Sequence, residues 1–273
     1  MKTTRKILPA IAMLVVSAVM LTTASFAWLA MNDTVDAKGM TANVRSDSIY
    51  LLIGAVTEEG QELNAESIQN SPSTSATGTP LDVDNNDTPD DAEDDTRPTT
   101  VLPVDVDLTK ATTGAAMKTA ANWYYGSGAS ASDGTLTGGK QYLSSFLEYV
   151  VRYKYYVTME AGSPSKDNLK VVDLKITDSN TGDTITDLAP VTVIVACGDQ
   201  YEKFTYAQYT EAVAGGKPGA AGTVDLTGTA QVTDAAALEI CVYIYYDGNN
   251  AAVTTNNIAN LAGVNVEFSL QAN

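Results

Sequence analysis

Histidine is absent from the 273-residue sequence. Histidine is the side chain that titrates nearest neutral pH, and it is the most common metal ligand in proteins. Its absence excludes Ser-His-Asp triads, Cys-His pairs and zinc sites of the His-Glu-x-x-His type. The many carboxylates show no spacing that singles out a catalytic pair. We therefore expect a protein that is not an enzyme.

Cysteine is scarce, because Cys197 and Cys241 are the only two in the chain. In an exported protein a single disulfide between them is chemically permitted. However, Cys197 shares its predicted strand face with three valines, whereas Cys241 lies opposite the aliphatic face of its own strand. Two alternatives stay open, a disulfide and a pair of buried free thiols.

Basic residues are also few, since 16 Lys and Arg stand against 33 Asp and Glu for a net charge of −17. Such an acidic surface repels nucleic acid and anionic lipid, favours solubility and can gather divalent cations. We therefore expect no nucleic-acid partner.

The long apolar run of the sequence lies at the N-terminus. Residues 7–20 are almost wholly apolar and follow Lys2, Arg5 and Lys6. The small residues Ser25 and Ala27 stand three and one before the Ala27–Trp28 bond, which is the pattern of a secretory signal cleaved at that bond. The alternative is an uncleaved membrane anchor, since residues 7–31 exceed the roughly 20 residues that span a bilayer. Polar residues in its second half favour cleavage.

Cleavage would leave residues 28–273, 273 − 27 = 246 residues with a net charge of 13 − 33 = −20. A chain of that size is commonly a single all-β domain. Its new N-terminus would carry an apolar arm, which we predict to be a strand donor: Trp28, Leu29, Met31 and Val35.

The arm reads Ala-Trp-Leu-Ala-Met-Asn-Asp-Thr-Val-Asp-Ala-Lys-Gly-Met over residues 27–40. It resembles the region after the signal in the TasA/camelysin-like exported proteins of Gram-positive bacteria, which the SipW-type signal peptidase processes. The C-terminal strands over residues 238–246 and 264–270 are similar to the ends of many such proteins. The resemblance implies a secreted subunit of an extracellular fibre or biofilm matrix. Camelysin-like proteins have been called metallopeptidases, and the absence of histidine argues against that activity here.

Alternation of apolar and polar residues predicts a mainly β fold. We expect an antiparallel β-sandwich, jelly-roll-like, preceded by the N-terminal signal or apolar helix and carrying long surface loops. The strictest alternation, over residues 147–159, predicts the central strand, and residues 201–213 have the spacing of a short helix. Further strands are expected at residues 40–45, 49–56, 101–108, 169–177, 191–197, 238–246 and 264–270.

Residues 64–100 are rich in Ser, Thr, Pro, Asn and Asp, and predict a flexible acidic insertion. Within it, oxygen ligands occur at the spacing of a calcium-binding EF-hand loop. Asp87 stands where the loop normally has glycine, and Pro89 stiffens the next step, so a solvated charge run remains the alternative. The candidate calcium ligands are Asp82, Asp84, Asn86, Asp90 and Glu93.

An aromatic trio, Trp123, Tyr124 and Tyr125, precedes a glycine-rich stretch. Such rings can stack on sugars, although more commonly they cover one end of a core. Between residues 101 and 108 the alternation predicts an edge strand, with these side chains on one face: Leu102, Val104, Val106 and Leu108.

Two functions follow from these patterns. The first is a secreted structural subunit that self-associates into a homopolymer, with residues 28–40 donating a strand to a neighbour or pairing within their own subunit. The alternative is a monomeric adhesive or carbohydrate-binding module at the cell surface. No sorting motif follows the last strand, so we expect no sortase attachment, and contact with the membrane only through the N-terminal segment. We expect no cofactor other than calcium.

Overall fold

The computed structural model describes residues 41–46, 51–81, 102–126, 139–146, 149–178, 191–205, 220–249 and 264–273. All of them belong to one compact unit, Asp36–Asn273. The chain is mainly β and its sheets are predominantly antiparallel, which confirms that part of the sequence prediction. Among the described residues, no helix is both long and apolar enough to cross a membrane.

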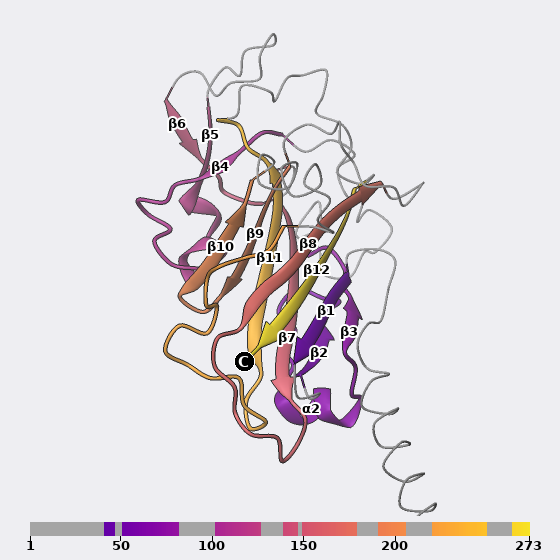
Figure 1. Ribbon diagram of the computed structural model, residues 1–273. Coiled ribbons are helices and arrows are strands. Elements are labelled where there is room, and N and C mark those ends of the chain that lie inside the picture. Colours follow the sequence, from indigo (N-terminus) through magenta and orange to yellow (C-terminus); the bar gives the residue numbers. More distant parts are fainter. Residues whose placement is uncertain are drawn as a thin grey trace, which may run out of the picture. The chain divides into compact units, whose positions relative to one another are not determined.

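A four-stranded sheet contains the first and last strands of the described chain. Its order is β3 (Ser75–Thr77), β1 (Thr41–Ser46), β12 (Val264–Ala272) and β8 (Lys170–Asp178). β1 and β12 run parallel, and the other pairs are antiparallel (Figure 1). The chain therefore returns at its C-terminal strand to pair with its first described strand.

A five-stranded sheet is antiparallel throughout. The strand expected at its centre was predicted wrongly, because β7 is second from the edge and β11 is central. Every residue of β11 from Ile240 to Tyr246 is buried, as expected of a strand that is covered on both faces. In the first half of β7, by contrast, buried residues alternate with the partly exposed Arg152 and Lys154. The order is β10 (Gln200–Phe204), β9 (Val191–Cys197), β11 (Leu238–Tyr246), β7 (Val151–Met159) and β2 (Leu51–Ala55).

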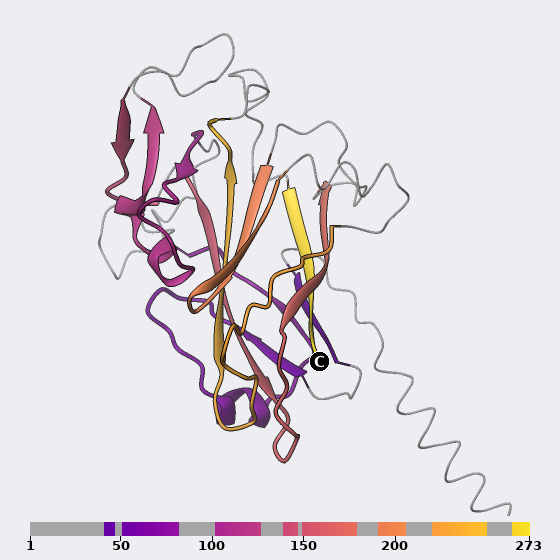
Figure 2. The same ribbon diagram turned by 60° about the vertical axis from the view of Figure 1, so that its left-hand side comes forward.

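The main core lies between these two sheets. Alternate residues of β7, the odd-numbered ones from Val151 to Met159, contribute to the same buried cluster as β8 and β12. Across it, the Tyr155 and Phe268 rings meet edge to face with centroids 5.6 Å apart. The turned view in Figure 2 shows β12 (yellow) apart from β11 (orange).

The outer face of the five-stranded sheet is also covered. A second buried cluster lies there around Trp123, with Phe146 and Tyr243, and a third surrounds Ile68 with Tyr156. The segments that cover this face include a three-stranded sheet, in the order β4-β5-β6, and short helices. Their bounds are β4 Asp105–Val106, β5 Trp123–Gly126, β6 Lys140–Tyr142, α2 Ala65–Asn70, η1 Ala115–Lys118 and η2 Ala120–Asn122.

The prediction of a flexible insertion at residues 64–100 was wrong for residues 64–81. Asn64 caps α2, since its side chain accepts a hydrogen bond from Ser67 N at 2.8 Å. Ile68 is 3 % exposed, and Leu81 N donates to Arg152 O on β7 at 2.9 Å. A few well-spaced apolar residues suffice to hold the segment, although its average composition is polar. Residues 82–100 lie outside the described part.

The prediction of a helix over residues 201–213 was also wrong for its described beginning. Residues 200–204 form β10, which pairs with β9 through a two-residue turn whose Gly198 has a φ of 53°. Glycine adopts this positive φ readily, and tight hairpins require it. The hairpin therefore overrides the helical spacing, which depended on residues beyond 205 that lie outside the described part.

Candidate functional site

Three of the predicted sites lie outside the described residues. They are the cleavage site at Ala27 and Trp28, the arm with Leu29, Met31 and Val35, and the acidic calcium loop from Asp82 to Glu93. All three stay predictions. Within the described ranges, no group of three or more Asp, Glu or Cys side chains could hold a metal ion.

The two cysteines are both free and buried. Cys197 lies in the core between the two main sheets, whereas Cys241 lies in the cluster on the outer face. Because Cys241 pairs with Ala196, the residue next to Cys197, the two thiols are on opposite faces of the same sheet. The structure therefore favours the two free thiols over the disulfide. Burial raises the pKa of Cys197 to about 11 and that of Cys241 to about 12.

The aromatic trio is divided between core and surface. Trp123 is fully buried, and its indole N–H donates to Met117 O at 2.9 Å. Its ring packs edge to face against Tyr245, with centroids 5.1 Å apart. The core-covering interpretation is therefore confirmed for Trp123, while Tyr124 and Tyr125 are half-buried.

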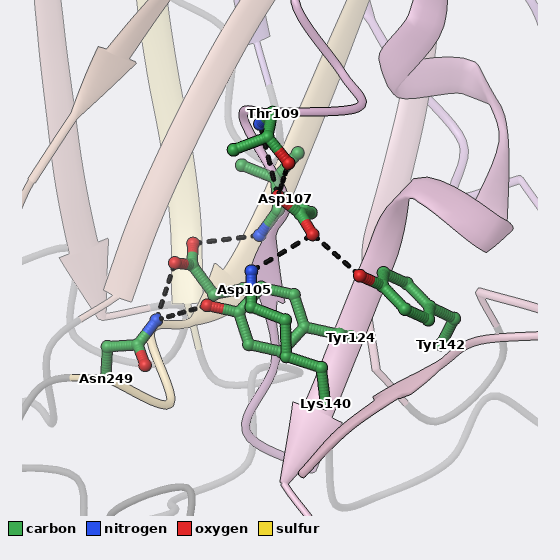
Figure 3. A network of polar contacts seen from close by, with 8 residues as sticks. Asp105, Asp107, Thr109, Tyr124, Lys140, Tyr142 and Asn249 are labelled. Atoms are coloured by element: carbon green, nitrogen blue, oxygen red, sulfur yellow. Dashed lines mark hydrogen bonds and ion pairs between the residues drawn. The ribbon is translucent and has the colours of Figure 1, made fainter.

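Tyr124 belongs to a polar cluster that the sequence did not predict. The cluster joins side chains of the three-stranded sheet and its flanking turn to Asn249, which follows β11 in the chain (Figure 3). We define it by six residues: Asp105, Asp107, Tyr124, Lys140, Tyr142 and Asn249.

Asp107 is the buried member of the polar cluster, with 4 % of its surface exposed. One carboxylate oxygen accepts from Thr109 Oγ1 at 2.7 Å and from its backbone N–H at 3.1 Å. The other accepts from Lys140 Nζ at 3.0 Å and from the Tyr142 hydroxyl at 2.8 Å. These hydrogen bonds, led by the Thr109 hydroxyl, hold the pKa of Asp107 well below its ordinary value. Asp107 therefore stays ionised at neutral pH.

Asp105 ties the polar cluster to the five-stranded sheet. Its Oδ1 accepts from Val106 N at 2.9 Å and from Lys203 Nζ on β10 at 3.2 Å. Its Oδ2 accepts from Asn249 Nδ2 at 2.6 Å, and Asn249 also donates to the Tyr124 hydroxyl at 3.0 Å. The oxygens of both carboxylates, Asp105 and Asp107, thus accept hydrogen bonds from groups of the chain itself.

Lysines lie over the two surface tyrosines of the polar cluster. Lys110 Nζ is 3.2 Å from the centroid of the Tyr142 ring, and Lys140 Nζ is 4.3 Å from that of Tyr124. Each cation–π contact occupies one face of its ring. These contacts hold segments of the small sheet together and leave the rings poorly suited to stacking on a sugar.

The sequence analysis did not predict the polar cluster, because the alternation over residues 101–108 placed the wrong side chains on the buried face of the strand. Val104 and Val106 are buried as expected, but Leu102 is 42 % exposed and Leu108 is 45 % exposed. The prediction was therefore wrong at both ends of this segment. A local signal existed, because Asp two residues before Thr is typical of an Asx turn, in which the carboxylate bonds the backbone.

A third feature is an open stretch on β12. The β1–β12 register runs from Thr41 opposite Glu267 to Ser46 opposite Ala272. β12 begins earlier, at Val264, so residues 264–266 extend past β1 while they pair with β8 on the other side. Within the described ranges, no strand pairs with them on the β1 side. We call these three residues the open ladder.

Comparison with known proteins identifies no relative: no family model, no curated protein and no solved structure matches the chain. The functional argument therefore depends on the geometry described above and on the sequence patterns.

Proposed function

We propose that this chain is an exported structural subunit of an extracellular fibre or matrix, in which the N-terminal arm donates a strand to a neighbouring subunit. In this proposal the two main sheets form a jelly-roll-like sandwich. The register of β1 and β12 is the observation on which the proposal depends, because residues 264–266 extend past the described part of β1, and main-chain groups at such a position can pair with a further strand.

The register of β1 indicates which residues reach the open ladder. Each β1 residue faces the β12 residue whose number is 226 higher, since 267 − 41 = 226. If a donated strand kept the same offset, residues 38–40 would pair with residues 264–266. In our proposal the arm pairs with the open ladder, either in its own subunit or by exchange with a neighbour.

The apolar residues of the arm favour the exchange. Met31 precedes Lys38 by 38 − 31 = 7 residues, and Trp28 and Leu29 are further upstream. Three main-chain positions cannot accommodate that length, so these large apolar side chains extend beyond the open ladder. Their burial against a second subunit would be favourable by roughly 1.5–3 kcal/mol for each fully buried aliphatic side chain.

The edge of the four-stranded sheet at β8 is protected. Residues 220–226 bond to its main chain, with Ala220 N donating to Leu174 O at 2.9 Å and Gly222 N donating to Val171 O at 2.7 Å. The Glu202 carboxylate accepts from Thr223 N at 2.6 Å, which anchors this segment to β10. A covered edge resists pairing with other chains, so the proposed assembly proceeds through the arm and is directional.

The alternative function, a carbohydrate-binding or adhesive module, receives less support. Trp123 is buried, and lysines occupy ring faces of Tyr124 and Tyr142. A glycan array remains the direct measurement for this alternative.

The first experiment removes residues 28–38 from the mature chain that begins at Trp28. We expect the full mature chain to form polymers in negative-stain micrographs and the shortened chain to elute as a monomer in size-exclusion chromatography. Two further variants form a matched pair. In the test variant, three of the apolar arm residues are replaced with serine. In the control variant, the exposed Leu102 and Leu108 are replaced with serine. Polymers that persist without the arm would contradict the proposal.

The second experiment distinguishes exchange from pairing within one subunit. Gly39→Cys and Asn265→Cys are made in separate chains, which are then mixed and oxidised. If the arm is exchanged between subunits, the mixture forms a disulfide-linked dimer, and either chain alone gives a much weaker dimer band. Pairing within one subunit predicts instead that only the double variant crosslinks, and that it migrates as a monomer on a non-reducing gel.

A further inference from the structure

A charged cavity of about 170 Å³ lies on the outer face of the five-stranded sheet. β7 and β11 form one wall of this cavity. Their register places Arg152 opposite Tyr243 and Lys154 opposite Cys241. Lys118 at the end of η1 lines it too, as does Glu59, which follows β2. Segments far apart in the sequence therefore enclose one space.

The cavity concentrates positive charge in an acidic protein. Three of the 16 basic residues line it, together with two carboxylates, which gives a local charge of 3 − 2 = +1 against −17 for the whole chain. Lys118 and Glu59 are about half exposed, with 46 % and 54 % of their side-chain surfaces accessible. A ligand from solvent can reach the cavity on their side.

The carboxylates of the cavity are already bound. Glu59 Oε2 accepts from Arg152 Nη2 at 3.0 Å, and Glu239 forms an ion pair with Lys118. Glu239 also accepts from the Tyr156 hydroxyl at 3.0 Å and from the Cys241 thiol at 3.3 Å. The carboxylate oxygens that line the cavity thus already accept hydrogen bonds from the protein. The groups that are still available to a ligand there are hydrogen-bond donors.

Tyr243 supplies a buried donor without a partner. The residue is 1 % exposed, and its hydroxyl has no hydrogen-bond partner among the described residues. Cys241 is its neighbour on the same strand face and interacts with it, but sulfur is a weak acceptor and the thiol donates its own proton to Glu239. Burial raises the pKa of Tyr243, so the hydroxyl keeps its proton at any ordinary pH. Leaving such a group unsatisfied carries a desolvation penalty that a bound oxyanion would relieve.

Lys154 is the second donor. Its Nζ approaches the Gln61 carbonyl at 3.5 Å, which is a long hydrogen bond. An ammonium has three N–H donors, so most of its capacity is available to a ligand.

We propose that this cavity binds a small oxyanion, such as a carboxylate, sulfate or phosphate group, with the Tyr243 hydroxyl and the Lys154 and Lys118 ammonium groups as donors. A charged oxygen satisfies the buried hydroxyl and balances the local positive charge. The volume admits an organic acid of several carbon atoms as well as an inorganic ion. This inference is separate from the fibre function, because none of the described residues that line the cavity belongs to the open ladder.

The test is isothermal titration calorimetry of the full chain in a low-salt buffer, with sodium succinate, sodium sulfate and sodium phosphate as separate probes. We expect saturable binding of one site per chain by at least one probe, and the probe that binds distinguishes an organic acid from an inorganic ion. Tyr243→Phe, which keeps the ring, should weaken that binding roughly tenfold or more, as loss of a hydrogen bond to a charged group does. Lys154→Gln should weaken it as well.

Tyr142→Phe is the matched control, because it removes a tyrosine hydroxyl outside the cavity, and Lys140→Gln is the control for Lys154. Both should bind the probe as the unaltered chain does. The proposal is overturned if none of the probes gives saturable heat, or if the control variants weaken binding as much as the cavity variants. Should Tyr243→Phe fail to fold, the comparison of Lys154→Gln with Lys140→Gln decides the outcome.

Discussion

At the scale of single residues, the buried carboxylate of Asp107 is the most informative group. It sits almost entirely out of water, and bonds from Thr109, Lys140 and Tyr142 satisfy its oxygens. Because its pKa is depressed in the folded state, folding is linked to pH through this residue.

We predict that Asp107→Asn lowers the melting temperature most at neutral pH. A carboxyl whose folded pKa lies below its ordinary value of 3.8 stabilises the protein above that pH, and this stabilisation is lost as pH falls through the acid range towards the folded pKa. The melting-temperature difference between variant and parent should therefore hold from pH 7 to about pH 5 and shrink as pH falls from there towards about pH 2, measured by circular dichroism. Glu160→Gln, at an exposed position, is the control and should show little difference. A difference for Asp107→Asn that stays constant with pH would contradict the linkage.

The cysteines give a second prediction at this scale. Because both are buried free thiols with raised pKa values, about 11 and 12, neither should react readily with iodoacetamide in the native protein at pH 8. In guanidinium chloride both should be alkylated, and intact mass should be the same with and without reductant beforehand. A native mass lower by two hydrogen atoms would show a disulfide and contradict the structure.

At the scale of elements, burial along a strand decides which alternating positions matter. Residues 101–108, which contain β4, alternate as regularly as β8 does, yet Leu108 is exposed while Leu174 is fully buried. The difference arises because β8 faces another sheet, whereas Asp107 turns the chain into the polar cluster and brings Leu108 to the surface.

The two leucines form a matched pair for mutation. We predict that Leu174→Ala lowers the free energy of unfolding by about 2–5 kcal/mol, because it opens a cavity between the two main sheets. Leu108→Ala should change it by less than about 0.5 kcal/mol. Urea denaturation followed by tyrosine and tryptophan fluorescence measures both, and similar losses in the two variants would show that the segment is packed as the alternation alone predicted.

At the scale of the whole molecule, charge opposes the proposed assembly. Each mature subunit would carry a net charge of −20, so neighbouring subunits repel one another. Screening shortens the reach of this repulsion, from about 30 Å at 0.01 M salt to about 8 Å at 0.15 M.

We therefore predict that polymerisation of the chain beginning at Trp28 accelerates as sodium chloride rises between these two concentrations, followed by light scattering. Calcium chloride at equal ionic strength distinguishes screening from specific binding. An additional acceleration by calcium, lost when Asp82, Asp84 and Glu93 are replaced with Asn, Asn and Gln, would support the predicted calcium loop. Assembly that slows as salt rises would contradict the electrostatic argument.

Much of the fold was predictable, because strand alternation is a local property of the sequence. The odd-numbered face of β7, the buried run of β9 and the β8, β11 and β12 strands lie where their patterns indicated. Local patterns did not predict α2 or β10. The helix α2 depends on contacts with β7, and the strand β10 depends on the tight turn that follows β9. The candidate sites were less predictable. Asp105 and Asn249 are 144 residues apart in the chain and meet only when β4 docks beside the end of β11.

The sequence by itself determined the class of the fold, the acidity of the surface and the exclusion of histidine chemistry, because composition and period-two alternation need no knowledge of what packs against what. Only the tertiary structure decided the central place of β11, the opposite faces of the two thiols and the gathering of Lys118, Lys154 and Tyr243 around one cavity. These features depend on strand order and register, which pair residues far apart in the chain. One residue of shift in register would move every side chain of a strand to the other face, so no local pattern can specify them.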